Sequence, residues 1–324
     1  MSDLDLKDWR ILFELDLDSR QSLQSIGKKV GLSKEVTSYR VKKLCEKGII
    51  ASFFTRIDTS KLGILIFRTL IRLYNITPEK EAALIDYIVD FEKVGWCVSV
   101  DGAWDLNFIY WADSISDFSG FWRGLLSKYG DYIQEKEVSV FDKYIQFPKL
   151  FLLKERKLDN IPSFPCGRSQ LVGVDKKDVR ILSILASNSR TPSIDIAEKI
   201  GVSAKAVSRK IKRMKDKGII QGHGISLNLR KIGFTYFKLH LFFKRFDKER
   251  FKDLIAFCRH NPYIIYTNEP IGATDLELDI NIENEDSYHE LLNEIRYKFS
   301  DLIKDFESLH YFKEHKHNLF PRKQ

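Results

Sequence analysis

The sequence predicts an α+β protein made of two copies of one two-part unit. The second half of the chain repeats the first half with a shift of 170 residues, so that residues 47–50 align on 217–220 without a gap. Position by position, about 21 of the 59 residues from Asp5 to Gly63 are identical to their partners. In each copy, helical periodicity gives way to alternating strand-like and helical segments. A repeat this long is a duplicated protein rather than a solenoid unit, so we expect one chain to form an intramolecular pseudo-dimer.

The start of each copy is predicted to form three short helices and a strand. Caps and glycines mark the boundaries in copy one: Asp5 before helix one, a break over 18–20, Ser22 before helix two, Gly31 after it, Ser33 before helix three, Gly48 after it, and a strand over 49–57. Copy two has the matching signals: Thr191 as a cap with Pro192 at the first helical position, Gly201, Ser203, Gly218, and a strand over 219–227.

The rest of each copy has the order βαββαβ, which favours a four-stranded antiparallel sheet with two helices on one face. The predicted segments in copy one are 64–74, 78–91, 94–101, 104–111, 114–129 and 133–145, and those in copy two are 234–243, 248–260, 264–271, 274–282, 285–299 and 303–312. Residues 154–173 contain Pro162 and Pro165 and are predicted to be an extended linker between the copies.

Composition favours a polyanionic partner and a reducing compartment. The net charge is +8 and the pI about 9.1, and the positive charge is concentrated on the third helix of each copy, more strongly in copy two. No apolar run reaches transmembrane length, and the acidic N-terminus is unlike a signal peptide. The four cysteines are far apart, which fits the cytoplasm better than a disulfide framework. We expect a cytoplasmic protein with no membrane partner.

The second and third helices of each copy form a helix–turn–helix, whose outer face can enter the major groove of double-stranded DNA. Residues near the start of the third helix can reach base edges, and the later basic residues can meet phosphate. The predicted DNA-binding residues are Lys34, Ser38, Tyr39, Arg40, Lys42 and Lys43 in copy one, and Lys205, Ser208, Arg209, Lys210, Lys212 and Arg213 in copy two.

These motifs resemble the Lrp/AsnC regulators. The resemblance rests on Leu4-Asp5-x-x-Asp8, on Gly31-Leu32-Ser33 and on Gly48-Ile49-Ile50, with Leu62-Gly63 following, and it covers nearly the whole chain apart from the linker. It implies two winged helix-turn-helix domains and two βαββαβ ferredoxin-like (RAM) domains arranged as an intramolecular pseudo-dimer. The expected boundaries are 1–58, 59–153, 154–173 for the linker, 174–228 and 229–324.

The resemblance also implies a small effector, such as an amino acid, near a Gly-x-x-Asp turn at an interface between RAM domains, and self-association through those domains. The candidate effector residues are Gly102, Trp104, Asp105, Gly272, Thr274 and Asp275. A structural reading stays open: the two glycines supply a positive φ, and the two aspartates cap the turn. The difference between Trp104 and Thr274 indicates that the two loops are no longer equivalent.

The main functional hypothesis is a sequence-specific DNA-binding transcription regulator that is not an enzyme. Neither a nucleophile triad nor a phosphate-binding loop is present, and no cofactor is predicted. No cysteine lies near the histidines at 310, 315 and 317 in the sequence, and no metal site is predicted. Two alternatives stay open. One is an enzyme resembling the siroheme decarboxylases, which share this architecture, and the other is an architectural protein that coats DNA.

Overall fold

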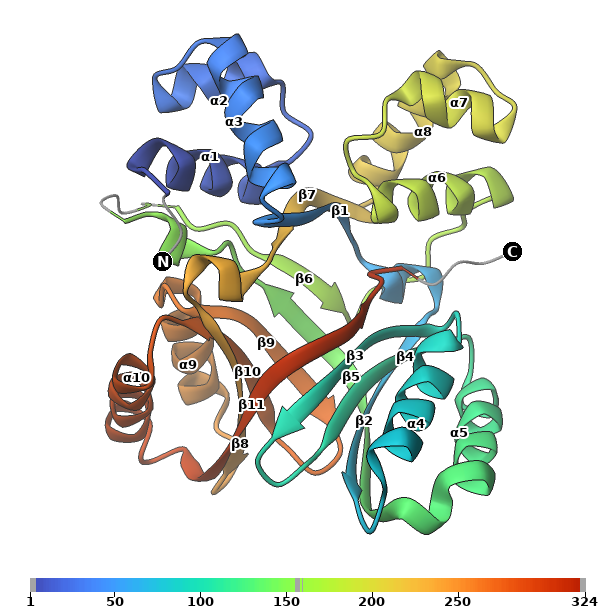
Figure 1. The fold of residues 1–324 in the computed structure, drawn as a ribbon, viewed down its shortest axis with the longest axis vertical. Helices are drawn as coiled ribbons and strands as arrows, with labels where there is room; N and C mark the ends of the chain where they lie inside the picture. The colour runs from blue at the N-terminus through green and yellow to red at the C-terminus, as the bar shows by residue number, and fades with distance from the viewer. Residues whose placement is uncertain (1–3, 155–157, 159, 321–324) are drawn as a thin grey trace.

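The computed structural model describes residues 4–154, 158 and 160–320 of the 324-residue chain. Parts of three predicted regions lie outside the described residues: the first three residues of the first domain, four residues of the linker, and the last four residues of the chain. Figure 1 shows two small helical heads on one end of a large β structure, which carries helices on its outer sides. No helix in the described part is long and apolar enough to cross a membrane.

The heads have the helices predicted from the sequence. Head 1 consists of α1 (Leu6–Leu17), α2 (Leu23–Val30), α3 (Lys34–Glu46) and the strand β1 (Ile50–Ile57). Head 2 consists of α6 (Lys176–Ser187), α7 (Ser193–Ile200), α8 (Ala204–Asp216) and β7 (Ile220–Leu227). Asp5 and Asp175 each form a capping box with the aspartate three residues later, which satisfies backbone N–H groups at both ends of the box.

The predicted start of α7 is wrong by one residue. Pro192, rather than Thr191, occupies the cap position, with extended backbone angles. The Thr191 hydroxyl donates to the Asn188 carbonyl at 2.8 Å instead of capping the helix. The helix therefore begins at Ser193 without a side-chain cap.

The βαββαβ order is confirmed in both copies. Sheet unit 1 consists of β2 (Leu65–Leu73), α4 (Pro78–Asp90), β3 (Val94–Asp101), β4 (Leu106–Ala112), α5 (Ile115–Tyr129) and β5 (Ile133–Gln146). Sheet unit 2 consists of β8 (Thr235–Phe243), α9 (Lys248–His260), β9 (Ile264–Ile271), β10 (Leu276–Ile282), α10 (Glu285–Lys298) and β11 (Ile303–His317). The strand β11 continues five residues beyond its predicted end.

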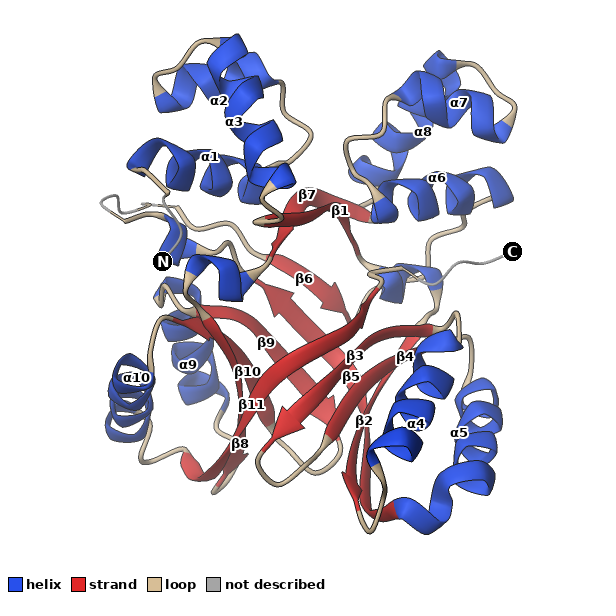
Figure 2. Cartoon of the chain, in the orientation of Figure 1, coloured by secondary structure: helices blue, strands red, loops and turns tan. Residues whose placement is uncertain are grey.

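The two sheet units close into one barrel. The order β2-β4-β3-β11-β8-β10-β9-β5 returns to β2 through a β2–β5 pairing (Figure 2). All pairs are antiparallel, and the copies meet at β3–β11 and β5–β9. The helices cover the outside, where they bury one apolar cluster for each unit. Closure leaves these eight strands without a free edge, and it confirms the intramolecular pseudo-dimer.

Each head sits over the sheet unit of the other copy. The strands β1 and β7 pair antiparallel beneath the heads, so the chain crosses over at this point (Figure 1). The core of head 1 includes Phe234 and Ile265 from copy two. The core of head 2 includes Ile66 and Trp111 from copy one, together with Phe320. At the crossover each head therefore shares an apolar core with the sheet unit of the other copy.

The segment between the copies is not simply an extended linker. Within it, β6 (Phe164–Gly167) pairs with the end of β5 and extends the sheet beyond the barrel. Pro165 concealed this strand in the sequence, because proline is usually read as a strand breaker. At the sheet edge it is tolerated, since one side of β6 has no partner strand in the sheet order.

Candidate functional site

The third helix of each head is fixed by a short turn and a buried inner face. Gly31 and Gly201 end the preceding helices in the left-handed conformation, with φ near +70°, which suits glycine. Ser33 and Ser203 then cap α3 and α8 by accepting a backbone N–H three residues on. The buried inner faces are Thr37, Val41 and Leu44 in α3 and Val207, Ile211 and Met214 in α8.

Thr37 is fully buried, and its hydroxyl donates to the Ser33 carbonyl at 2.7 Å. A buried hydroxyl with a partner costs little. The polar side chain is therefore compatible with firm docking of α3.

Most of the residues predicted to contact DNA are exposed on the outer faces of α3 and α8. Tyr39 is 64% exposed. The other exposed members of the set are Lys34, Ser38, Lys42 and Lys43 on α3 and Lys205, Ser208, Arg209, Lys212 and Arg213 on α8. Both helices project from the same end of the barrel (Figure 1).

Three basic residues of the set form ion pairs with aspartates at the start of the first helix of their own heads. Arg40 contacts Asp5 at 2.7 Å and Asp8 at 2.9 Å, and Lys210 makes the matching contacts with Asp175 and Asp178. Hydrogen bonds to the two aspartates raise the pKa of Arg40. Arg213 also pairs with Asp178. These pairs tie the third helix to the start of the first, so part of the basic charge contributes to the structure of the head.

The two Gly-x-x-Asp turns lie at the ends of β3 and β9. Asp105 accepts the backbone N–H of Leu73, and Asp275 accepts that of Phe243. Gly102 has a φ of +131°, as expected, but Gly272 does not have a positive φ. A side chain at Gly272 would meet Cβ of Ser139 at 2.8 Å, so this glycine permits a close approach of two strands.

Trp104 and Thr274 differ as the sequence indicated. Trp104 packs against the apolar cluster at this end of the barrel. Thr274 is buried, and its hydroxyl donates to Glu277 at 3.1 Å. The six candidate effector residues do not line the cavity beneath β1 and β7, which lies toward the other end of the barrel.

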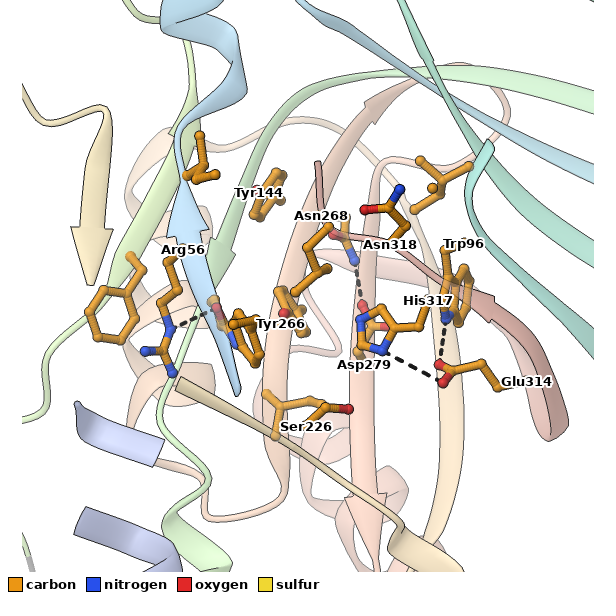
Figure 3. Close-up of a pocket in the computed structure, with 18 of the residues that line it drawn as sticks. Arg56, Trp96, Tyr144, Ser226, Tyr266, Asn268, Asp279, Glu314, His317 and Asn318 are labelled. Carbon is orange, nitrogen blue, oxygen red and sulfur yellow. Dashed lines mark hydrogen bonds and ion pairs between the residues drawn. The ribbon is translucent and has the colours of Figure 1, made fainter. Parts of the chain in front are cut away.

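A cavity of about 220 Å³ opens inside the barrel beneath β1 and β7, the wing strands of the two heads (Figure 3). Phe54 and Arg56 of β1 and Ile225 of β7 form its roof, and side chains from both sheet units form its walls. Aromatic rings dominate the lining: Phe54, Trp96, Trp111, Phe141, Tyr144, Phe164, Tyr236 and Tyr266. Aromatic walls with a few polar groups are typical of small-molecule sites.

The charged groups of the cavity are already paired. Arg56 donates to Gln146 and lies 3.6 Å from Asp16, which also binds Lys149 at 2.7 Å. Lys238 contacts Glu277 at 3.0 Å and Asp279 at 3.3 Å. Burial lowers the pKa of a lysine, but these two carboxylates outweigh it and raise the pKa of Lys238.

At the rim of the cavity Glu314 accepts the Trp96 indole N–H and pairs with His317 (Figure 3). Each lysine and arginine of the described lining therefore has a carboxylate within 4 Å. Among the described residues, no group of three or more His, Cys, Asp or Glu side chains is placed to hold a metal ion.

Sequence reasoning did not find this cavity. The sequence gives no reason to group Trp96 and Trp111 with Arg56, Asp279 and Asn281. Their shared position depends on barrel closure between the copies, which periodicity does not reveal. One signal was present in the repeat: polar residues of copy two align with apolar residues of copy one along the inward face of the strands.

Comparisons with known proteins agree on the heads. A family profile described as winged helix-turn-helix DNA-binding matches residues 4–51 and 174–221. The transcriptional regulator AzlB of Bacillus subtilis is 32% identical over 121 residues, which are 36% of this chain and 76% of AzlB. LrpA of Pyrococcus horikoshii is 42% identical over 62 residues, which are 19% of this chain. The chain thus spans 44% of the length of LrpA, less than half.

Two solved structures of one protein match the chain almost from end to end. The siroheme decarboxylase NirDL aligns with a TM-score of 0.65 over 98% of this chain and 94% of its own, at 12% identity. At that identity the likeness concerns the fold. It nevertheless corrects the expectation that the chain is not an enzyme, because the same full-length architecture serves catalysis in NirDL. The physical reason is that a fold does not fix its chemistry, and a barrel that encloses a cavity can hold a substrate as well as an effector.

Proposed function

The chain belongs to the Lrp/AsnC family of transcription regulators, and on that premise we propose that it is a sequence-specific regulator that binds one DNA site with two unlike heads. One observation carries the proposal. Two helix–turn–helix units with exposed basic third helices stand on the same end of one closed barrel. In a homodimeric regulator two identical heads read a palindrome. Here the two helices that would enter the major groove, α3 and α8 (the reading helices), differ in sequence, so the operator should have unlike half-sites.

The proposed contacts divide into base readout and phosphate binding. Near the start of each reading helix, the exposed side chains differ between the copies: Tyr39 aligns with Arg209. Arginine can contact guanine with two hydrogen bonds, which tyrosine cannot do. Lys42 and Lys212 lie later on the helices and suit phosphate. Arg40 and Lys210 are assigned a supporting role, because both are engaged by aspartates of their own heads.

Self-association beyond one chain, a small effector and a cytoplasmic location complete the proposal. All four cysteines are free, which fits a reducing compartment. The outer faces of the barrel are the natural surfaces for self-association, since the copies have already used their sheet edges on each other.

Footprinting on genomic fragments tests the proposal. We expect short protected sites with two non-identical halves. Continuous protection without sequence preference would instead support an architectural protein that coats DNA. A duplex in which one half-site is duplicated as a palindrome serves as the matched control, and it should bind less tightly than the natural asymmetric site.

A second candidate is tetrapyrrole chemistry, favoured by the full-length fold likeness to NirDL. The paired charges of the cavity weigh against it, because a tetrapyrrole with several carboxylates needs free cations. Incubation with siroheme under reducing conditions tests this candidate. A shifted absorbance spectrum and loss of carboxylate groups from the product would support it, and an unchanged spectrum and substrate would reject it.

A further inference from the structure

The two walls of the cavity beneath the wing strands differ chemically at four pairs of equivalent positions. The 170-residue repeat places ten pairs of equivalent residues in the lining, and at four of these pairs an apolar residue of copy one matches a polar residue of copy two. In copy one the four residues are Ile66, Trp96, Ile109 and Trp111, and in copy two the matching residues are Tyr236, Tyr266, Asp279 and Asn281. A homodimer would have two identical walls. At these four positions the copy-one wall offers aliphatic and indole surface, and the copy-two wall carries hydroxyl, carboxylate and amide groups.

One polar group on the second wall has no partner. Asn281 is 1% exposed, and its side-chain oxygen forms no hydrogen bond with the rest of the described chain. Its neighbour Asp279 is fully engaged, since it accepts from Tyr236 and Asn268 and pairs with Lys238. A buried acceptor without a partner costs about 1–3 kcal/mol, so Asn281 is the group on this wall that a ligand would satisfy.

Size and charge restrict the ligand further. A volume of about 220 Å³ lies below the roughly 300–1,000 Å³ of sites for drug-sized molecules. Each cationic side chain that lines the cavity is within 4 Å of a carboxylate, so an anionic ligand would have to displace an existing ion pair. Flat aromatic walls favour a flat ligand.

We propose that this cavity binds a small, uncharged, planar nitrogen heterocycle. Its apolar edge would lie against Trp96 and Trp111, and a ring or exocyclic N–H would donate to Asn281. Free nucleobases and nicotinamide have this chemistry. The ligand therefore differs from a tetrapyrrole in size and from a free amino acid in charge.

The position of the cavity suggests a regulatory role, and that part of the inference rests on the proposed function. Phe54 and Arg56 belong to β1, and Ile225 belongs to β7. These paired strands carry the heads, so a ligand beneath them contacts the segment that fixes the spacing of the heads. A ligand that prefers one spacing must change DNA affinity, and DNA must change ligand affinity by the same factor.

Ligand binding is tested without DNA, using tryptophan fluorescence of the full chain. Adenine and nicotinamide are titrated to millimolar concentration, with uroporphyrin as a polycarboxylate and benzoate as a flat anion. We expect saturable quenching by at least one of the two heterocycles and none that saturates with the two anionic probes. Saturable binding of either anionic probe, or no saturable binding of either heterocycle, would overturn the proposal.

Two variants test whether Asn281 contacts the ligand. Asn281→Leu keeps the side-chain volume and removes the acceptor, and it should weaken binding about tenfold, as expected for one lost hydrogen bond. Asn293→Leu, on the exposed side of α10, is the matched control and should bind as the unchanged protein does. Equal affinity of the Asn281 variant and the unchanged protein would remove Asn281 from the site. Circular dichroism of both variants separates this effect from misfolding.

The coupling between ligand and DNA is tested by measuring DNA affinity with and without a saturating concentration of the heterocycle. We expect a change of at least fivefold, absent in Asn281→Leu at the same ligand concentration. Quenching without any change in DNA affinity would overturn the coupling but retain the cavity site. Quenching by a protein that binds no DNA at all would overturn the proposed function and leave the ligand site standing.

Discussion

The two heads occupy equivalent positions but are held to the barrel by different chemistry. Under head 1, Asp16 is fully buried between Lys149 and Arg56. Under head 2 the equivalent of Asp16 is Ala186, and Phe320 packs in the same apolar cluster. Phe320 is the counterpart of Lys149 in copy two. Gln146 of β5 pairs with Tyr266 in the same way that His317 of β11 pairs with Trp96, so β11 has one residue more than β5. Duplication therefore kept the geometry while the contacts diverged from charged to apolar.

The largest expected effect comes from breaking the charged contact. Asp16→Ala leaves two buried cations without their carboxylate, and we expect it to lower the free energy of unfolding by about 3–5 kcal/mol. Urea denaturation measures this loss. The double variant Asp16→Ala/Lys149→Phe copies the chemistry of head 2 and should recover at least half of it. A loss below about 1 kcal/mol for the single variant would show that the ion pairs are not what holds head 1.

A second difference between the wings predicts a dependence on pH. His223 of β7 aligns with Phe53 of β1, and its Nδ1 lies 3.0 Å from the Thr55 hydroxyl. Burial, with smaller contributions from Lys215, Arg20 and Arg56, lowers the pKa of His223 to about 3.

The folded state therefore disfavours the protonated imidazole. Because the pKa is lower in the folded than in the unfolded chain, the stabilisation is complete above about pH 6.5 and is lost as the pH falls toward 3. Each pH unit in that window should cost up to about 1.4 kcal/mol.

His223→Phe copies the other wing and should flatten this part of the stability profile. Urea midpoints between pH 4 and 7 measure the slope. The exposed His289, changed to Gln, is the control and should leave the slope as it is. An equal slope in His223→Phe and the unchanged protein would mean that other groups cause the acid sensitivity.

The reading helices provide the next comparison. Arg209→Ala should lower affinity by about 1–3 kcal/mol and relax base preference in one half-site only. Tyr39→Ala at the matching position should affect the other half-site and less strongly. Binding to a library of randomised half-sites measures both. Equal relaxation in both half-sites after the Arg209 change would contradict the assignment of one head to each half.

Features that depend on residues close together in the chain could be predicted from the sequence, and features that depend on residues far apart in the chain could not. Caps such as Asp5 and Ser33, and glycines such as Gly31, act within a few residues, so the helices of both heads were placed correctly apart from the start of α7, which is wrong by one residue. The internal repeat also predicted the pairing of the copies. The effector turns, by contrast, were chosen by resemblance, and their aspartates cap neighbouring strands.

The features that sequence reasoning missed depend on contacts across the barrel. Arg56 meets Gln146 across 90 residues, and Lys149 meets Asp16 across 133 residues. A charged residue such as Asp16 on the inner side of an otherwise apolar helix was a usable signal, because buried carboxylates require a partner. It did not identify that partner, since Lys149 lies after the end of β5 and reaches head 1 only through the crossover.

The smallest expected effect separates the phosphate contacts of the two heads. Lys42 lies 3.7 Å from Glu46, and both side chains are well exposed. The negative charge of Glu46 therefore offsets part of the positive charge of Lys42. Lys212 lies among more basic residues on α8. Lys212→Ala should reduce the slope of log affinity against log salt by about 0.9, the value for one phosphate contact, and weaken binding to all sequences alike. Lys42→Ala should reduce the slope by less, because binding DNA with Lys42 also brings Glu46 toward the phosphates. Titrations at four salt concentrations distinguish the two, and a larger slope change for Lys42 would reverse the assignment of head 2 as the stronger phosphate-binding head.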